Sequence, residues 1–324
     1  MVNSEYDELK IFSGNAHPDL TRSICGYLEA RQGECEVFQF SNENIFVKVG
    51  ENVRQRDVFI VQPMSTPVNT SIMELLIMID AMNRASAGRI TAVVPYYAYG
   101  RSDKKDQPRV PITARLLANM IETAGADRVI TVDLHAGQIQ GFFNVPVDEL
   151  TALYMISRYF RKKQLSNAVV VAADEGASKR ARNVAQSLEV PLAIIEKRRL
   201  ANDEQVEALN VIGDVRGCQA VMIDDEILSG GTMVEGAALL REKGATAVYA
   251  GVTHAILSGK AAERIAGSVI EELVTTDTIP LPPEKQLDKI TVLSIAPLIG
   301  ETIARIHTGR SVGELFQEPD GGNG

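Results

Sequence analysis

Short apolar runs rich in β-branched residues alternate with amphipathic segments along most of the chain. Several runs are continuously apolar, which is typical of parallel strands buried on both faces of a sheet. The predicted strands are residues 58–62, 90–95, 129–134, 168–173, 192–196, 220–224, 247–253 and 290–296. Because helical patterns lie between these strands, we predict an α/β fold with mostly parallel central sheets flanked by helices.

Periodic apolar positions and the residues at segment ends predict three of the intervening helices. Residues 71–85 place their apolar side chains on one stripe of a helix. The segment 111–124 has proline near its first turn and stops at Gly125, and residues 232–243 stop at Gly244. Glycine is favoured just after a helix because it readily adopts the left-handed conformation there.

The order of strand, loop, helix and strand is similar in the two halves of the chain. With 324 residues the chain is long enough for two domains of ordinary size. We therefore expect one α/β domain over residues 1–152 and a second, related one over residues 153–317. The final stretch, EPDGGNG at 318–324, is polar and glycine-rich, which predicts a disordered tail.

Composition narrows the class of protein. The 33 basic and 42 acidic residues give a net charge of −9, which disfavours a general affinity for nucleic acid or anionic membranes. The three cysteines lack the CxxC spacing of a zinc site and do not suggest a disulfide framework. The chain start lacks the apolar core of a signal peptide, and no apolar run of about 18 residues could span a membrane. These features predict a cytoplasmic enzyme.

The segment VMIDDEILSGGT, residues 221–232, is the most informative stretch for function. Its apolar start predicts a strand that delivers two adjacent carboxylates, Asp224 and Asp225, ahead of a glycine-containing turn at 230–232 and a helix start. Backbone N–H groups in such a turn and the positive end of the helix dipole bind phosphate. The carboxylates suit ribose hydroxyls or a magnesium ion. An ordinary strand–turn–helix connection is the alternative that this loop alone leaves open.

Two segments of the first half carry charged groups beyond predicted strands. The segment 95–115 contains Arg101, Lys104 and further basic residues that suit a flexible arm over a triphosphate. Taken alone, a solvated charged loop explains this segment slightly better. The segment 131–143 brings His135 to the carboxyl end of a strand, where ligands bind in open α/β sheets. His135 suits a metal or a phosphate, although a structural role is commoner for a single histidine.

Two segments of the second half place charges in similar positions. Asp174 follows the apolar run at 169–173, and its carboxylate suits magnesium. The segment IIEKRR, residues 194–199, places Lys197 and Arg199 just beyond the next strand. Such cations neutralise the negative charge that develops during phosphoryl transfer.

These segments, in this order, resemble the ribose-phosphate pyrophosphokinase (phosphoribosyl pyrophosphate synthetase) family from about residue 11 to residue 316. The most specific matches are PVNTSIMELLIMIDAMNRASA, VVPYYAYGRSDKK, ETAGADRVITVDLHAGQIQGFF and SVGELF. The resemblance implies two phosphoribosyltransferase-like (type I) domains in a homo-oligomer, with dimers assembling to a hexamer. It implies transfer of the β,γ-diphosphoryl group of MgATP to O1 of ribose 5-phosphate, giving phosphoribosyl pyrophosphate and AMP, with Mg²⁺ as cofactor.

The resemblance also implies a role for individual residues. Lys197 and Arg199 match the catalytic cations, and His135 and Asp174 match the metal positions. The ATP-binding positions are Phe40, Asn42, Asn44, Arg101, Ser102, Asp103 and Lys104. The ribose-5-phosphate-binding positions are Asp224, Asp225, Leu228, Ser229, Gly230, Gly231 and Thr232.

Departures from the family pattern fall at several of these positions. Leu228 stands where the family usually has an acidic residue, and leucine accepts no hydrogen bond. Asn42 and Asn44 replace carboxylates, and Ser102 replaces a glutamine. A second hypothesis is therefore a weakly active or non-catalytic paralogue that binds nucleotide or sugar phosphate and associates with or regulates a true synthetase. A phosphoribosyltransferase that consumes phosphoribosyl pyrophosphate is disfavoured by the two-domain length and by the Lys197 segment.

Overall fold

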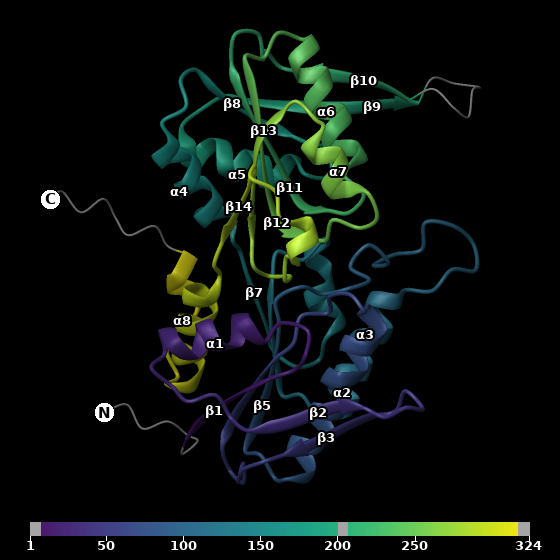
Figure 1. The fold of residues 1–324 in the computed structure, drawn as a ribbon, viewed down its shortest axis with the longest axis vertical. Helices are drawn as coiled ribbons and strands as arrows, with labels where there is room; N and C mark the ends of the chain where they lie inside the picture. The colour runs from purple at the N-terminus through teal and green to yellow at the C-terminus, as the bar shows by residue number, and fades with distance from the viewer. Residues whose placement is uncertain (1–7, 200–206, 317–324) are drawn as a thin grey trace, which may run out of the picture. The chain divides into compact units, whose positions relative to one another are not determined.

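The computed structural model describes residues 8–199 and 207–316, which form two compact units (Figure 1). The first unit comprises Met1–Leu150 and Ser294–Gly324, and the second comprises Thr151–Leu293. The expected tail at 318–324 lies outside the described residues. No helix in the described ranges is long and apolar enough to cross a membrane.

The first unit is built on a parallel five-stranded sheet in the order β1-β4-β5-β6-β7. These strands are Leu9–Ser13 (β1), Asp57–Val61 (β4), Arg89–Val94 (β5), Arg128–Val132 (β6) and Val147–Leu150 (β7). The helices of this unit are Pro18–Tyr27 (α1), Val68–Arg84 (α2), Thr113–Ala124 (α3) and Ala296–His307 (α8). The 3₁₀ turns are Gly137–Phe142 (η1) and Gly313–Phe316 (η3), and an antiparallel hairpin joins Cys35–Gln39 (β2) to Ile45–Val49 (β3).

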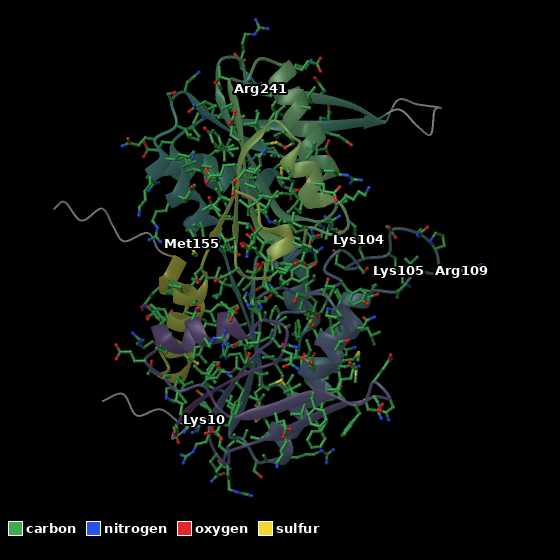
Figure 2. All side chains as sticks on the ribbon, in the orientation of Figure 1. Lys10, Lys104, Lys105, Arg109, Met155 and Arg241 are labelled. Atoms are coloured by element: carbon green, nitrogen blue, oxygen red, sulfur yellow. The ribbon has the colours of Figure 1, made fainter. Side chains whose placement is uncertain are left out.

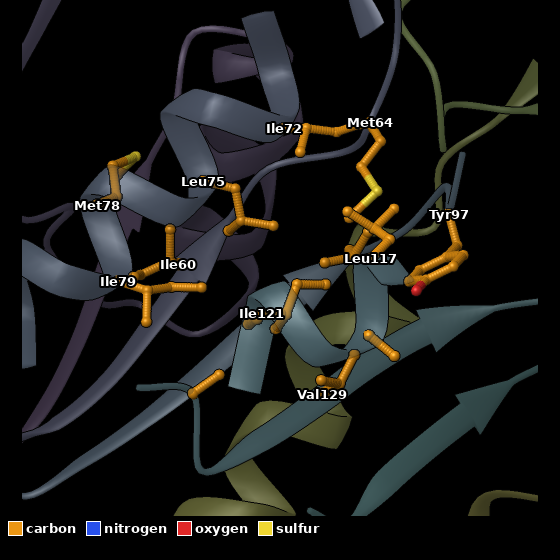
Figure 3. Close-up of a cluster of buried hydrophobic side chains, with 14 of the residues drawn as sticks. Ile60, Met64, Ile72, Leu75, Met78, Ile79, Tyr97, Leu117, Ile121 and Val129 are labelled. Carbon is orange, nitrogen blue, oxygen red and sulfur yellow. The ribbon is translucent and has the colours of Figure 1, made fainter. Parts of the chain in front are cut away.

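Helices α2 and α3 cover one face of this sheet with apolar side chains (Figure 3). Leu75 and Ile79 of α2 are fully buried, four residues apart, as expected for the inward stripe of a helix. Leu117 and Ile121 form the corresponding stripe on α3. Helix α3 begins two residues after Pro111 and ends at Ala124, followed by the cap residue Gly125, whose φ of 113° is left-handed.

The chain returns to the first unit at its C-terminal end, where α8 packs against α1 (Figure 1). A Cβ atom at Gly300 would lie 2.5 Å from Cδ1 of Tyr27, so only glycine permits this close approach. Residues 294–316 therefore belong with the first sheet, whereas the expected division placed them in the second domain. A repeated order of elements cannot reveal such a return, because it depends on contacts between the two ends of the chain.

A buried ion network also fixes the end of α8. The carboxylate of Asp57 is completely buried and accepts hydrogen bonds from Arg89 Nε (2.8 Å) and Nη2 (2.6 Å). The Nδ1 atom of His307 lies 2.9 Å from Oδ2 of Asp57. Arg89 Nη2 also donates to the carbonyl oxygen of Ile306 at 3.2 Å. The network therefore joins β4 and β5 to the C-terminal end of α8.

The second unit contains a seven-stranded sheet in the order β10-β9-β8-β11-β12-β13-β14, in which only β10 is antiparallel to its neighbour. The strands are Ala168–Ala172 (β8), Leu192–Arg199 (β9), Glu207–Ile212 (β10), Gln219–Ile227 (β11), Ala247–Ala255 (β12), Ile270–Thr276 (β13) and Ile290–Leu293 (β14). The helices are Leu153–Lys163 (α4), Ser178–Leu188 (α5), Gly231–Glu242 (α6) and Ala261–Ala266 (α7), with a 3₁₀ turn at Pro283–Lys285 (η2).

Both faces of the second sheet are buried. Val170 and Ile223 face the cluster that includes α4 and α5, whereas Val171 and Met222 face the cluster that includes α6 and α7. This arrangement explains why these strands are continuously apolar. All eight predicted strands and the three predicted helices are present, with ends shifted by no more than three residues.

Candidate active site

Strand β11 and helix α6 present the segment with the two adjacent carboxylates. The strand continues past Asp224 to Ile227, three residues beyond its predicted end, because it stays paired with β12 as far as Ala255. Residues 228–230, here called the phosphate loop, then lead directly into α6. Gly230 has a left-handed φ of 75°, a conformation that favours glycine. The N–H groups of the first turn of α6, which point out of the start of the helix, therefore lie next to the loop.

Three carboxylates gather on the second unit. The N–H of Asp225 donates to Oδ1 of Asp224 at 2.9 Å, and Oδ2 of Asp225 lies 3.6 Å from Nη2 of Arg180 on α5. Burial and the nearby negative charges of Asp225 and Asp174 raise the pKa of Asp224 to about 8. A carboxyl group perturbed by burial and by like charges marks a candidate functional site.

Asp174 lies in the turn between β8 and α5. Its Oδ1 accepts the N–H of Ala177 at 2.9 Å, which fixes the turn. Oxygen donors of this kind are the ligands that Mg²⁺ prefers, and Mg²⁺ usually keeps several waters and substrate phosphates as its other ligands. The carboxylate oxygens of Asp174 therefore fit Mg²⁺ by their chemistry. No group of three or more His, Cys, Asp and Glu side chains in the described ranges is arranged to hold a metal ion.

The charged arm of the first unit, here called the flap (residues 102–113), is closed at its base. Tyr97 donates its hydroxyl hydrogen to the carbonyl oxygen of Ala114 at 2.9 Å, and the N–H of Ala114 donates to the carbonyl oxygen of Ser102 at 3.2 Å. Asp103 is buried and accepts a hydrogen bond from Nε2 of Gln138 in η1. Figure 2 shows Lys104, Lys105 and Arg109 along the projecting part of the flap, where all three are exposed.

His135 and Arg101 lie close to the base of the flap in the same unit. Both residues are exposed. A Cβ atom at Gly100, the residue before Arg101, would lie 3.2 Å from Cβ of His135, so the two segments are adjacent. The backbone just before His135 is held by Glu149, whose Oε1 accepts the N–H of Leu134 at 3.0 Å. The structure thus brings Arg101, Ser102, Asp103 and His135 to one region of the first unit.

The remaining predicted nucleotide-binding positions lie in the hairpin formed by β2 and β3. Phe40 is 49% exposed, and its ring centroid lies 4.9 Å from that of Phe38 and 5.8 Å from that of Phe46. The backbone N–H of Asn44 lies 3.2 Å from Oδ1 of Asn42, which closes the turn. The hairpin therefore offers an exposed aromatic face with amide groups beside it.

The structure describes the backbone of the predicted catalytic cations but not their side chains. The backbone of Lys197 and Arg199 belongs to β9 and pairs with Leu209 and Glu207 of β10. Their side chains lie outside the described part of the chain. Sequence reasoning missed Gln138 as a partner of the flap and gave no role to Arg180, since their partners are remote in sequence.

Two α/β units, one with an acidic strand followed by a glycine-containing turn and one with a basic flap, are the architecture of an enzyme of the phosphoribosyltransferase-like fold class. Residues 9–125 match the family model for the N-terminal domain of ribose phosphate pyrophosphokinase, and residues 200–317 match the phosphoribosyl synthetase-associated domain. The chain belongs to the ribose-phosphate pyrophosphokinase family. The expected family, fold class and enzyme class are confirmed.

Relatives match the chain along almost its whole length. The ribose-phosphate pyrophosphokinase of Caldanaerobacter subterraneus is 51% identical over 311 residues, covering 96% of this chain and 98% of its own. The Oceanobacillus iheyensis enzyme of the same name is 50% identical, covering 98% and 100%. The crystal structure of phosphoribosylpyrophosphate synthetase from Mycobacterium smegmatis is similar with a TM-score of 0.90 at 42% identity, covering 94% of this chain and 100% of that chain.

Proposed function

We propose that this chain is a ribose-phosphate diphosphokinase, which transfers the β,γ-diphosphoryl group of ATP to O1 of ribose 5-phosphate and releases AMP. The observation that carries the proposal is the phosphate loop, which follows Asp224 and Asp225 and leads into α6. Relatives that are about 50% identical over almost the whole chain carry the name of this activity. No comparison favours the non-catalytic paralogue.

The second unit supplies the sugar-phosphate side of the reaction. N–H groups of the phosphate loop and of the first turn of α6 bind the 5-phosphate, with help from Ser229 and Thr232. Asp224 and Asp225 accept hydrogen bonds from ribose hydroxyl groups. The half-buried Leu228 adds no hydrogen bond to the sugar, so affinity rests on the backbone donors and the two carboxylates.

The chemical step joins O1 of the sugar to the β-phosphorus of ATP. The O1–Pβ bond forms as the bond from Pβ to the α,β-bridging oxygen breaks, AMP leaves, and the O1 proton passes to solvent or to a carboxylate. Lys197 and Arg199 neutralise the charge on the transferred group. Positioning of the two substrates supplies much of the acceleration. The family resemblance gives Asp174 and His135 as the residues that would hold Mg²⁺, which would neutralise phosphate charge on the nucleotide.

The first unit supplies the nucleotide side. Arg101 and Lys104 contact the triphosphate through their positive charges, beside Ser102. The buried Asp103 supports this nucleotide site by fixing the base of the flap. The hairpin residues Phe40, Asn42 and Asn44 contact the base, since an exposed ring offers a stacking surface. The homo-oligomer of dimers assembling to a hexamer and the cytoplasmic location remain predictions.

The proposed activity has a direct assay. Purified protein is incubated with Mg²⁺, ATP and ribose 5-phosphate, and AMP is followed by chromatography, with a reaction lacking ribose 5-phosphate as the blank. We expect AMP that depends on ribose 5-phosphate. A Leu228→Asp variant runs in parallel. A silent wild type with activity gained by Leu228→Asp would instead identify a disabled paralogue.

Loosening the flap should weaken nucleotide binding selectively. We expect Gln138→Leu to raise the KM for ATP about fivefold, because it removes a hydrogen bond from the buried Asp103 at the flap base. The KM for ribose 5-phosphate should stay unchanged, since the phosphate loop belongs to the other unit. Gln140→Leu, on the same 3₁₀ turn and hydrogen-bonded to Glu149 and the carbonyl of Gly137, is the control. An unchanged KM for ATP in Gln138→Leu, or equal effects of both variants, would contradict this role of Gln138.

A further inference from the structure

The phosphate loop is held from outside by the segment that follows β12. Three successive carbonyl oxygens accept hydrogen bonds from residues 256–264. The carbonyl of Ile227 accepts the N–H groups of Ile256 and Leu257 (both 3.1 Å), and that of Leu228 accepts the N–H of Ser258 (2.9 Å). The carbonyl of Ser229 accepts a hydrogen bond from Nη1 of Arg264 (3.0 Å). The first two carbonyls are bound by main-chain donors. The third depends on a side chain, which a substitution can remove.

These bonds set the direction of the amide groups in the loop. In a planar trans peptide the C=O and the following N–H point in opposite directions. Because the carbonyls of residues 227–229 point toward the segment 256–264, the N–H groups of residues 228–230 point away from it. Successive N–H groups on one side of a turn form an anion-binding concavity, which the first turn of α6 extends.

Among the three peptides whose carbonyls are bound by the segment 256–264, the one between Ser229 and Gly230 is least restricted by its own sequence. Rotating this peptide changes ψ of Ser229 and φ of Gly230, and glycine accepts both signs of φ. Gly230 has a φ of 75° in this structure. Without a bond to the Ser229 carbonyl, the peptide is free to turn its N–H away from the concavity.

We propose that Arg264 is a positioning residue for the phosphate of the sugar phosphate. Its guanidinium holds the Ser229 carbonyl outward and thereby aims the Gly230 N–H at a phosphate oxygen. Arg264 acts through the peptide and does not touch the substrate. The identity of the ligand rests on the proposed function, whereas the bond between Arg264 and Ser229 does not.

The exposed position of Arg264 allows its hydrogen bond to Ser229 to be removed without disturbing the core. Arg264 is exposed on α7, whose packing is made by the buried Ala261 and Ile265. Truncating Arg264 therefore leaves the core of the second unit intact. Lys260, exposed at the start of the same helix, carries the same charge but has no hydrogen bond to the loop. Arg264→Met and Lys260→Met thus remove equal charge near the loop, and only the first removes the bond.

Binding of ribose 5-phosphate is measured by calorimetry without nucleotide, and KM and kcat are measured with ATP. We expect Arg264→Met to raise the Kd and the KM for ribose 5-phosphate about tenfold, with kcat and the KM for ATP nearly unchanged. Lys260→Met should resemble the wild type. The weaker binding of ribose 5-phosphate by Arg264→Met should persist at about 0.5 M KCl, because salt screens exposed charges but does not replace the missing hydrogen bond. Arg264→Lys, which keeps a donor, should recover most of the affinity at both salt concentrations.

Several results would overturn the proposal. An unchanged Kd in Arg264→Met would do so, as would equal weakening by Lys260→Met. If the weaker binding by Arg264→Met disappeared at high salt, Arg264 would act only through its charge. The proposed function fails separately: a wild type that binds ribose 5-phosphate but forms no AMP refutes the activity, and the binding comparison still decides the role of Arg264.

Discussion

Replacing Lys197 by alanine is expected to lower turnover about 1,000-fold while leaving the fold intact. The family resemblance assigns Lys197 the positive charge that stabilises the diphosphoryl group during transfer, and no shorter side chain supplies that charge. Alanine keeps the backbone pairing of position 197 with Leu209. The measurement is the rate of AMP formation at saturating ATP and ribose 5-phosphate, with thermal unfolding followed by circular dichroism.

The control for this experiment is Arg198→Ala. This variant removes the same charge from the next residue of β9, to which the resemblance gives no role. It should retain most of the wild-type turnover. Near-normal turnover of Lys197→Ala would refute the assignment, and an equal loss in both variants would show that only the overall charge of the segment matters.

Replacing Asp57 by asparagine is expected to lower the free energy of unfolding by about 3 kcal/mol at neutral pH. The carboxylate is completely buried and faces Arg89 and His307. Asparagine preserves the size of the side chain but leaves Arg89 without its counter-ion. Urea denaturation of both proteins measures the difference. Asp80→Asn is the control, because it breaks the exposed pair with Arg84 and should change stability little.

The effect of Asp57 should depend on pH. Burial alone would raise the pKa of Asp57, but hydrogen bonds from His307 and Arg89 and their positive charges outweigh it and hold the pKa below its ordinary value. The stabilisation is therefore complete above the unfolded pKa of about 3.9 and is lost as the pH falls through the lower, folded-state pKa. The stability difference between the wild type and Asp57→Asn should shrink below about pH 4. A difference that grows on acidification would contradict the network.

The sequence pattern predicted strands whose two faces are both buried. It missed strand β13, whose polar side chains are stabilised by contacts with distant segments. Strand β8 reads AVVVA and was identified from its apolar run. Strand β13 has the sequence IEELVTT, and its two glutamates interrupt the apolar run that would indicate a strand. Glu272 is tolerated there because its carboxylate accepts hydrogen bonds from Tyr159, Lys163 and Thr291. Such partners come from distant segments, so a local pattern cannot include them.

The same distinction applies to the candidate site. Asp224, Asp225 and the phosphate loop lie within 221–232, so their spacing alone indicated a phosphate and sugar site. The bonds from Gln138 to Asp103 and from Arg264 to Ser229 each join residues 35 positions apart. Spacing along the chain carries no signal for these supporting residues, because they act on the backbone or on another side chain.

The return of α8 to the first sheet has a consequence for synthesis on the ribosome. Asp57 and His307 are 250 positions apart, and all of Thr151–Leu293 is made between them. The second unit is one uninterrupted stretch and can fold as soon as it emerges. The face of α1 that receives Gly300, by contrast, stays uncovered until the final helix is released. We expect the nascent chain to complete its second unit first, and its first unit only after residues 294–316 have been released.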